Sequence, residues 1–375
     1  MVIENFKCFK NKTEFNFNKT DYKLLKRNVY DNILKGALFV GDNASGKTTA
    51  IQPIRLLLDL LLKDMDVRLP MYKCLFSDRK VTKLEYEFEI DNQNIKYFFS
   101  FERKKFLEEK LWVEDEIILE REENYAKLHL EDDVEFYDID DTLLFAKRVY
   151  FNTKFAENKT VAKWFDYLKK SVYLNALTRK TRSYNNESLA PRKYIEEQGT
   201  NRFNKFFKDY NFKYTLQCIE RLQEDDIQYT TKEDDENIFF KREGIDVIIP
   251  AYLESMGNLT LISILPAMFH VVDNGGMLII DEFSSGFHNK LEELIVRYIM
   301  QNGETTQLFF VSHSTNLLSN SILRPDQIYA VEMQGKEGSK LFRFSDEQPR
   351  AAQNMEKMYL SGVFGGIPEY GTDEE

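Results

Sequence analysis

The stretch FVGDNASGKTTAIQP, from Phe39 to Pro53, decides the fold class. From Gly41 to Thr48 it fits the pattern G-x-x-x-x-G-K-[ST], which forms a glycine-rich turn between a strand and a helix. In such a turn the glycines let backbone amides converge on a phosphate, the lysine reaches the β- and γ-phosphates, and the hydroxyl ligates magnesium. The apolar residues ALFV before the turn and the leucine-rich residues after it supply the flanking strand and helix. The stretch therefore predicts a phosphate-binding loop.

The ligands predicted for this loop are ATP and Mg²⁺. Its nucleotide contacts are assigned to Gly41, Asn43, Ala44, Ser45, Gly46, Lys47, Thr48 and Thr49. A second segment, GMLIIDE, reads as a buried strand that ends in two carboxylates. We expect Asp281 to hold the magnesium shell together with Thr48, and Glu282 to polarise a water for attack. A small GTPase would need an N-K-x-D guanine motif, which this sequence lacks, so that class is excluded.

Two further segments favour an ABC-type ATPase over a motor, a GTPase or a kinase. QLFFVSH is a strand that ends at His313, and in this order of motifs such a histidine contacts the γ-phosphate. YLESMGNLTLISILP opens an apolar helix with Ser255 and Gly257, whose hydroxyl, amides and positive dipole end suit a γ-phosphate. On this hypothesis Glu282 and His313 are catalytic, and Ser255 and Gly257 form the signature that faces a partner subunit.

The composition is typical of a folded protein with a sizeable core. Of its 375 residues 43% are hydrophobic, and they include 30 Phe and 20 Tyr. The three cysteines and four histidines show no metal-ligand spacing, which predicts free thiols in a reducing compartment and no zinc site. The sequence has neither a signal-peptide pattern nor a run of about 18 apolar residues. A cytoplasmic location without membrane contact is therefore expected.

Charge is distributed unevenly along the chain. The net charge is −11, yet residues 151–215 carry 14 Lys/Arg against 6 Asp/Glu, a surplus of +8. The acidic total argues against a protein that coats DNA along its whole surface. The basic segment, which includes LTRKTRSYNNESLAPRKY, is compatible with DNA phosphates, with an acidic partner, or with a solvated helical face.

The order of patterns predicts an α/β fold: an ABC-type P-loop NTPase lobe built from both ends of the chain. Residues 1–150 supply the phosphate loop and an antiparallel β subdomain, in which DNQN forms a hairpin turn. Residues 244–375 alternate strands and helices, as in a mixed sheet with helices on its faces. Residues 151–243 are expected to be an inserted, mainly helical subdomain, with TVAKWFDYLKKSVYLNAL helical and QEDDIQYTTKEDDEN an exposed loop or hairpin.

With these residues together, the sequence resembles the RecF/SMC-like branch of ABC ATPases. The resemblance rests on IENFKCFK as the opening strand, GDNASGKTT as the phosphate loop and ESMGN as a degenerate signature. DEFSSGFHNK is similar to a segment of the OLD-like members of that branch. VSHSTNLLSNSILRPDQIYAVEM and KMYLSGVFGGIP resemble the ATP-binding component of abortive-infection and related anti-phage systems, including AbiLi/RloA-type proteins and relatives of the PARIS ATPase.

The resemblance implies a homodimer, or a higher oligomer, that sandwiches two ATP molecules. Each ATP would be bound by the phosphate loop of one subunit and by the signature of the other. The chain also departs from the family pattern. KCLFSDRKVTKLEYEF contains no glutamine for a Q-loop, His288 stands where transporters often have an aspartate, and no heptad run predicts a long coiled coil.

Two functions are left open by these patterns. In the first, a regulated ATPase senses infection, through a phage component or DNA, and controls a separate toxic effector such as a nuclease. In the second, the chain is a DNA-repair or DNA-clamping ATPase of the RecF/SMC type. The segment YLSGVFGGIP favours the first, and the basic segment 151–215 is compatible with both.

Overall fold

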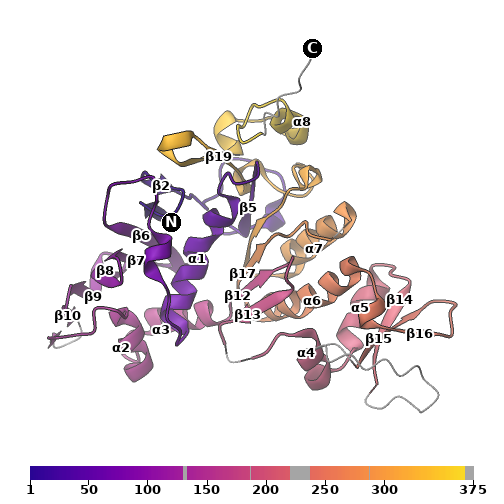
Figure 1. Ribbon diagram of the computed structural model, residues 1–375, viewed down its shortest axis with the longest axis horizontal. Coiled ribbons are helices and arrows are strands. Elements are labelled where there is room, and N and C mark those ends of the chain that lie inside the picture. The colour runs from indigo at the N-terminus through magenta and orange to yellow at the C-terminus, as the bar shows by residue number, and fades with distance from the viewer. Residues whose placement is uncertain (130–132, 186, 220–236, 287, 368–375) are drawn as a thin grey trace.

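The computed structural model of the protein describes residues 1–129, 133–185, 187–219, 237–286 and 288–367. Its centre is a seven-stranded sheet with the strand order β13–β12–β17–β18–β5–β19–β20 (Figure 1). The five strands from β12 to β19 in this order are parallel, and β13 and β20 are antiparallel edge strands. The bounds are β5 Gly36–Gly41, β12 Val172–Asn175, β13 Lys180–Ser183, β17 Gly276–Asp281, β18 Thr306–Val311, β19 Ile328–Met333 and β20 Ser339–Arg343.

The inner strands of this sheet are buried on both faces, which is why their sequences are continuous apolar runs. Because side chains alternate along a strand, they enter two different cores. Phe39 packs in one core with the helices α1 and α3, whereas Leu38 packs in the other with α6 and α7. The helix bounds are α1 Lys47–Leu62, α3 Lys159–Lys169, α6 Met256–Asn274 and α7 Asn289–Asn302. The predicted α/β lobe is confirmed.

The core that contains α1 also contains a sheet of eight antiparallel strands, ordered β11–β10–β9–β8–β7–β6–β1–β2. Its longest hairpin turns at Asp91 and Asn92, whose φ angles of 52° and 60° are those of a two-residue type I′ turn. The hairpin predicted at DNQN is therefore confirmed. The bounds are β1 Val2–Glu4, β2 Thr13–Glu14, β6 Thr82–Ile90, β7 Gln93–Glu102, β8 Lys105–Val113, β9 Glu116–Glu122, β10 Tyr125–Leu128 and β11 Val134–Phe136, and a separate short pair is β3 Val29–Tyr30 and β4 Ile33–Leu34.

The segment 151–243 differs from the predicted helical insertion. The helix expected over TVAKWFDYLKKSVYLNAL ends at Lys169, and β12 follows it inside the central sheet, between β13 and β17. The four residues of β12 form too short a stretch for periodicity to distinguish a strand from a helix. They form a strand because they pair with β17. The segment therefore contributes two strands, β12 and β13, to the central sheet of the lobe. Its other elements are the end of α2 Phe145–Thr153, α4 Pro191–Gln198, α5 Asn201–Asp209, β14 Tyr214–Cys218 and β15 Ile238–Arg242, and β16 Ile248–Pro250 follows.

The stretch QEDDIQYTTKEDDEN, which is expected to form an acidic loop or hairpin, spans residues 223–237. All of it except Asn237 lies outside the described residues. Among the described helices, α6 alone is long and apolar enough to cross a membrane, with a mean hydropathy of 1.3. Of its most apolar 18-residue stretch 72% is buried inside the protein, where the helix packs against β12, β17 and α7. Its apolar sequence is therefore accounted for as that of a core helix.

Candidate functional site

The glycine-rich loop connects β5 to α1 at the carboxyl edge of the central sheet. Gly41 and Gly46 have φ angles of 148° and 109°, which other residues rarely adopt. A Cβ at Gly46 would lie 2.5 Å from Cys8 Sγ, so a larger residue has no room there. Asn43 and Ala44 are exposed at the tip of the loop. The backbone therefore has the shape of an anion-binding turn at a helix N-terminus.

Two buried polar groups in this loop fit an anionic ligand. Lys47 is 6% exposed, and its ammonium donates to the carbonyls of Gly41 at 3.0 Å and Asp42 at 2.6 Å. Burial lowers the pKa of Lys47, and the charge of Glu282 opposes this effect. Within the described part of the chain, the buried Ser45 Oγ has no hydrogen-bond partner. A buried ammonium bonded to uncharged carbonyls and a buried hydroxyl without a partner can both donate to phosphate oxygens, so the loop is suited to ATP.

Thr48 and Asp281, predicted from separate motifs, are in direct contact. Thr48 Oγ1 donates to Asp281 Oδ1 at 2.9 Å, because the first turn of α1 lies beside the end of β17. Burial raises the pKa of Asp281, while the Thr48 hydroxyl acts in the opposite direction. A hydroxyl and a carboxylate at this separation present the oxygen ligands that Mg²⁺ prefers. Thr49 follows on α1 and is half-buried.

Glu282 and His313 lie on the loops after β17 and β18, near Lys47. Glu282 is half-buried and has a left-handed backbone with a φ of 57°. Partial burial and the Lys47 charge lower the pKa of His313, and the charge of Glu282 opposes them. The His313 amide donates to Ser284 Oγ at 3.2 Å, which joins the two loops. The phosphate loop, the Asp-Glu pair and the histidine therefore meet at one edge of the sheet.

Glu292, which the sequence motifs did not identify, holds the His313 loop. Its carboxylate is fully buried on α7 and accepts hydrogen bonds from Ser314 Oγ at 2.6 Å and from Ser312 Oγ at 3.1 Å. These two serines flank His313, so one buried carboxylate orients the loop on both sides. Burial raises the pKa of Glu292. The sequence does contain a signal for this role, because Glu292 is a carboxylate on the apolar stripe of the amphipathic helix α7.

Asn175 is a second residue that the sequence motifs did not identify. It ends β12 and lies opposite Asp281 in the parallel register of β12 and β17. Its amide hydrogen-bonds the Asp281 carboxylate, which favours the ionised form of that group. The side-chain oxygen Asn175 Oδ1 also accepts from the Thr178 amide and hydroxyl, both at 2.9 Å. The sequence pattern did not indicate Asn175 because it predicted a helix over the residues that form β12.

Ser255 and Gly257 lie at the N-terminus of α6, on the face of the sheet opposite α1. Ser255 is the N-cap residue, and its hydroxyl accepts from the Asn258 amide at 3.3 Å. Both Ser255 and Met256 are exposed. A Cβ at Gly257 would lie 2.7 Å from the Gly286 carbonyl oxygen, so this turn packs on the loop that follows Glu282. Ser255 therefore faces outward at the carboxyl edge of the sheet, and Gly257 lies beside it against the Gly286 loop.

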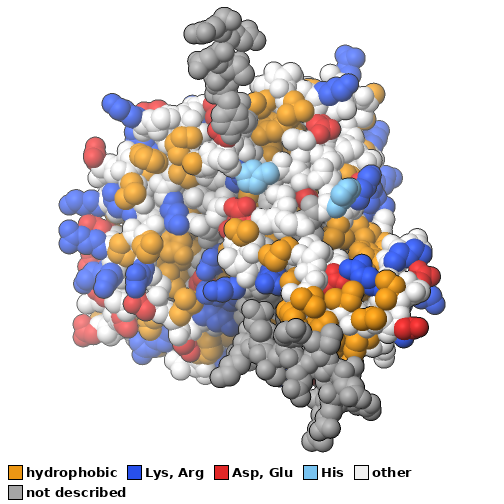
Figure 2. All heavy atoms as spheres, turned by 45° about the vertical axis from the view of Figure 1, so that its right-hand side comes forward, with side chains coloured by type: hydrophobic (Ala, Val, Ile, Leu, Met, Phe, Trp, Pro, Cys, Tyr) orange, Lys and Arg blue, Asp and Glu red, His pale blue; other side chains and the backbone are white. Residues whose placement is uncertain are grey.

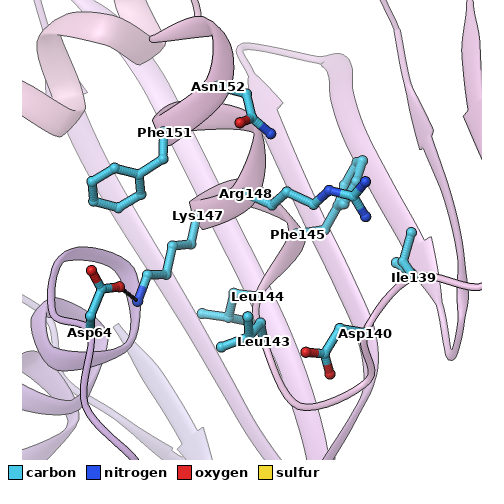
Figure 3. A pocket seen from close by; sticks show the side chains of 10 residues that line it. All are labelled: Asp64, Ile139, Asp140, Leu143, Leu144, Phe145, Lys147, Arg148, Phe151 and Asn152. Atoms are coloured by element: carbon cyan, nitrogen blue, oxygen red, sulfur yellow. Dashed lines mark ion pairs between the residues drawn. The ribbon is translucent and has the colours of Figure 1, made fainter.

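A cavity of about 400 Å³ lies elsewhere, between α2 and the end of α1 (Figure 3). None of the predicted site residues lines it. Lys147 points toward Asp64, with which it forms a 2.9 Å ion pair, and it also donates to the Lys63 carbonyl at 2.6 Å. Since Asp64 neutralises the charge of this ammonium, the cavity lacks the features of the phosphate site.

Comparison with known proteins places the chain in context. A family described as "AAA domain, putative AbiEii toxin, Type IV TA system" matches residues 37–319, a range that contains the phosphate loop, Asp281 and His313. No curated protein matches the sequence.

Among solved structures, the SMC head domain from Thermotoga maritima is similar, with 14% identity and a TM-score of 0.49 over 91% of this chain and 97% of that chain. An Smc head domain bound to the C-terminal domain of ScpA from Pyrococcus furiosus has 11% identity and a TM-score of 0.46, over 91% and 94% of the two chains.

Proposed function

The chain belongs to the AAA-domain family described as putative AbiEii toxin, type IV TA system, and we propose that it is an ABC-type ATPase acting as a nucleotide-controlled switch. The observation that carries this proposal is the contact of Thr48 with Asp281 beside Lys47, because it unites the two halves of a magnesium–nucleotide site. No other feature of the described residues combines an anion-binding turn with paired carboxylates.

Each site residue has a role that follows from its chemistry. Lys47 binds the β- and γ-phosphates, the loop amides bind the β-phosphate, and Thr48 and Asp281 hold Mg²⁺. The bound Mg²⁺ supplies neutralisation of phosphate charge. Glu282 orients and polarises the attacking water, and His313 contacts the γ-phosphate. Asn175 presents an amide at the Asp281 carboxylate, as a Q-loop glutamine would, and KCLFSDRKVTKLEYEF offers no glutamine for that role.

The signature acts on a second copy of the chain. Within one chain, α1 and α6 pack on opposite faces of the sheet, so Ser255 cannot reach the phosphates held by its own loop. Exposed apolar side chains surround the α6 N-terminus, with Leu253 at 67%, Val247 at 66% and Met256 at 55% exposure. This side of the molecule, at the right in Figure 1, comes forward in Figure 2, where apolar side chains gather on the surface. A partner subunit would cover them and close the ATP sandwich.

Ser255→Arg tests this arrangement. The variant should keep ATP affinity but lose hydrolysis by about 10²-fold, because the neighbour's helix terminus no longer approaches the γ-phosphate. Position 255 is a cleaner probe than Gly257, where any side chain would collide with the Gly286 carbonyl of the same chain. Asn274→Arg, which adds the same charge at the exposed far end of α6, is the control. Wild-type turnover by Ser255→Arg would rule out a role of this helix terminus in the site.

In the cell, we propose that this switch senses infection and controls a separate toxic effector. The family description names a putative AbiEii toxin and a type IV TA system, which supports a role linked to a toxic activity, and the separate effector is our proposal. DNA clamping of the RecF/SMC type is the second candidate, and the basic segment 151–215 is its main support. Six basic residues of that segment form ion pairs with carboxylates, which reduces the charge available to DNA phosphates. These are Lys163, Arg182, Arg192, Lys193, Arg202 and Lys213.

A phage challenge separates the two candidates. The gene is expressed with its genomic neighbours in a bacterial host, and plaque formation is compared for wild type and Lys47→Ala. If the ATPase controls an effector, protection should require both an intact Lys47 and a neighbouring gene. Purified protein is then titrated with duplex DNA at increasing salt, with and without ATP. Tight, ATP-dependent DNA binding together with no protection would instead support the DNA-clamping function.

A further inference from the structure

The C-terminal segment, residues 355–367, is used by none of the roles above. It consists of the helix α8 Met355–Leu360, a turn over residues 361–364 and a bend at position 365, and it continues to position 367. Its sequence contains KMYLSGVFGGIP, with three glycines in five residues. Figure 1 shows α8 at the top of the molecule, above the central sheet and on the same side as β19. The segment therefore lies at the edge of the sheet that carries the phosphate loop.

One end of this segment rests on the first residue of the phosphate loop. A Cβ built on Gly366 would lie 3.2 Å from the Val331 carbonyl oxygen and 3.6 Å from Gly41 Cα. Gly366 also has a φ of 72°, donates its amide to Glu332 Oε2 at 3.0 Å, and accepts from the Tyr359 hydroxyl at 3.0 Å. Gly41 is the residue whose carbonyl holds the Lys47 ammonium, so Gly366 supports the backbone of the phosphate loop.

The segment is anchored firmly enough to act as a support. The Phe364 ring stacks on Phe344 with centroids 3.8 Å apart and an interplanar angle of 11°. Tyr359 is 6% exposed and stacks on the same Phe344 ring. Burial raises the pKa of Tyr359 to about 12, so its hydroxyl stays protonated and can donate to Gly366. Two stacked rings and the Gly366 hydrogen bonds therefore hold the chain against β19.

The other end of the segment holds the histidine loop. Glu356 on α8 accepts a hydrogen bond from Thr315 Oγ1 at 2.5 Å, and Thr315 follows His313 by two residues. Glu292 binds the same loop from α7 through Ser312 and Ser314. The 355–367 segment thus hydrogen-bonds the histidine loop at one end and lies close to Gly41 of the phosphate loop at the other.

We propose that Gly366 and Glu356 are positioning residues of the nucleotide site. Gly366 lies against the paired residues Gly41 and Val331 at the ends of β5 and β19, and so limits where the phosphate loop begins. Glu356 sets the position of the His313 loop, and the chain between Glu356 and Gly366 fixes the separation of the two loops. Binding of a γ-phosphate between the two loops should then change the position of the C-terminal segment. This inference rests on the proposed ATPase function, which it deepens by adding a support outside the recognised motifs.

A matched pair of glycine variants tests the role of Gly366. Gly366→Ala introduces a Cβ against Val331 and Gly41, whereas Gly362→Ala introduces one at a position with no atom within 4 Å. Both glycines have a positive φ, 72° and 86°, so the backbone strain is similar in the two variants. ATP affinity, measured by calorimetry, should fall about tenfold for Gly366→Ala and stay within about twofold of wild type for Gly362→Ala. Equal affinities in the two variants would overturn the role of Gly366.

Glu356 is tested through turnover rather than binding. Glu356→Ala should lower kcat about tenfold with little change in ATP affinity, because His313 is displaced while the phosphate loop is not. Glu356→Gln retains an acceptor for Thr315 and should recover most of the rate, and Lys357→Ala on the exposed side of α8 is the control. A rate for Glu356→Ala equal to that of the control overturns this half of the inference.

Lys47→Ala separates failure of this inference from failure of the proposed function. If Lys47→Ala loses ATP binding but Gly366→Ala matches Gly362→Ala, only the positioning role is wrong. If Lys47→Ala still binds ATP, the assignment of this loop to ATP is wrong. The positioning role proposed for the C-terminal segment then fails with it.

Discussion

Lys47→Ala should bind ATP at least about 10²-fold more weakly than wild type, the largest effect expected of any single substitution in this protein. Lys47 is a buried cation whose ammonium donates to two backbone carbonyls, neither of which carries a neutralising charge, so it can engage phosphate oxygens. Removing it leaves the loop amides to bind a polyanion without a counter-charge. Titration calorimetry at fixed magnesium measures the change directly.

Lys35→Ala is a closely matched control for this experiment. Lys35 is also a partly buried lysine whose pKa is lowered by burial, and its ammonium donates to the Gly303 carbonyl at 2.7 Å. It precedes β5, whereas Lys47 lies beyond the opposite end of that strand. Its loss should lower stability without changing ATP affinity. ATP binding by Lys47→Ala at the strength of Lys35→Ala would remove the phosphate-loop assignment.

Glu282→Gln should bind ATP and Mg²⁺ normally but hydrolyse ATP about 10²-fold or more slowly, as for loss of a general base. The amide keeps the size of the side chain at the left-handed backbone position but cannot accept a proton from water. ATP that is bound and not hydrolysed should hold the two subunits together. Light scattering should therefore show a dimer in ATP that is not formed in ADP.

Two comparisons make the Glu282 result specific. Glu304→Gln, at an exposed carboxylate before β18, should leave the rate unchanged. Asp281→Asn should weaken the dependence of binding on magnesium, since it alters the partner of Thr48. Hydrolysis by Glu282→Gln at the wild-type rate would transfer the catalytic role, with His313 the next residue to test.

The local parts of the site could be predicted from the sequence. The phosphate loop depends on residues close together along the chain, and its glycines and lysine are required by backbone geometry at each position. The Asp-Glu pair follows an apolar run that reads as a buried strand whatever its neighbours are. The hairpin at Asp91 and Asn92 was equally clear, because its turn requires two residues that tolerate a positive φ.

The tertiary structure decided what no local pattern could reveal. Whether Val172–Asn175 becomes a strand depends on pairing with β17, about a hundred residues away, and only that pairing brings Asn175 to Asp281. Glu292 is unremarkable in sequence until α7 packs beneath the serines beside His313.

Gly366 likewise meets Gly41 only when the two ends of the chain pack on neighbouring strands. Side-chain period and turn chemistry therefore determined the motifs of this protein. Long-range strand pairing and core packing determined which residues support them, because those contacts join segments that share no local sequence signal.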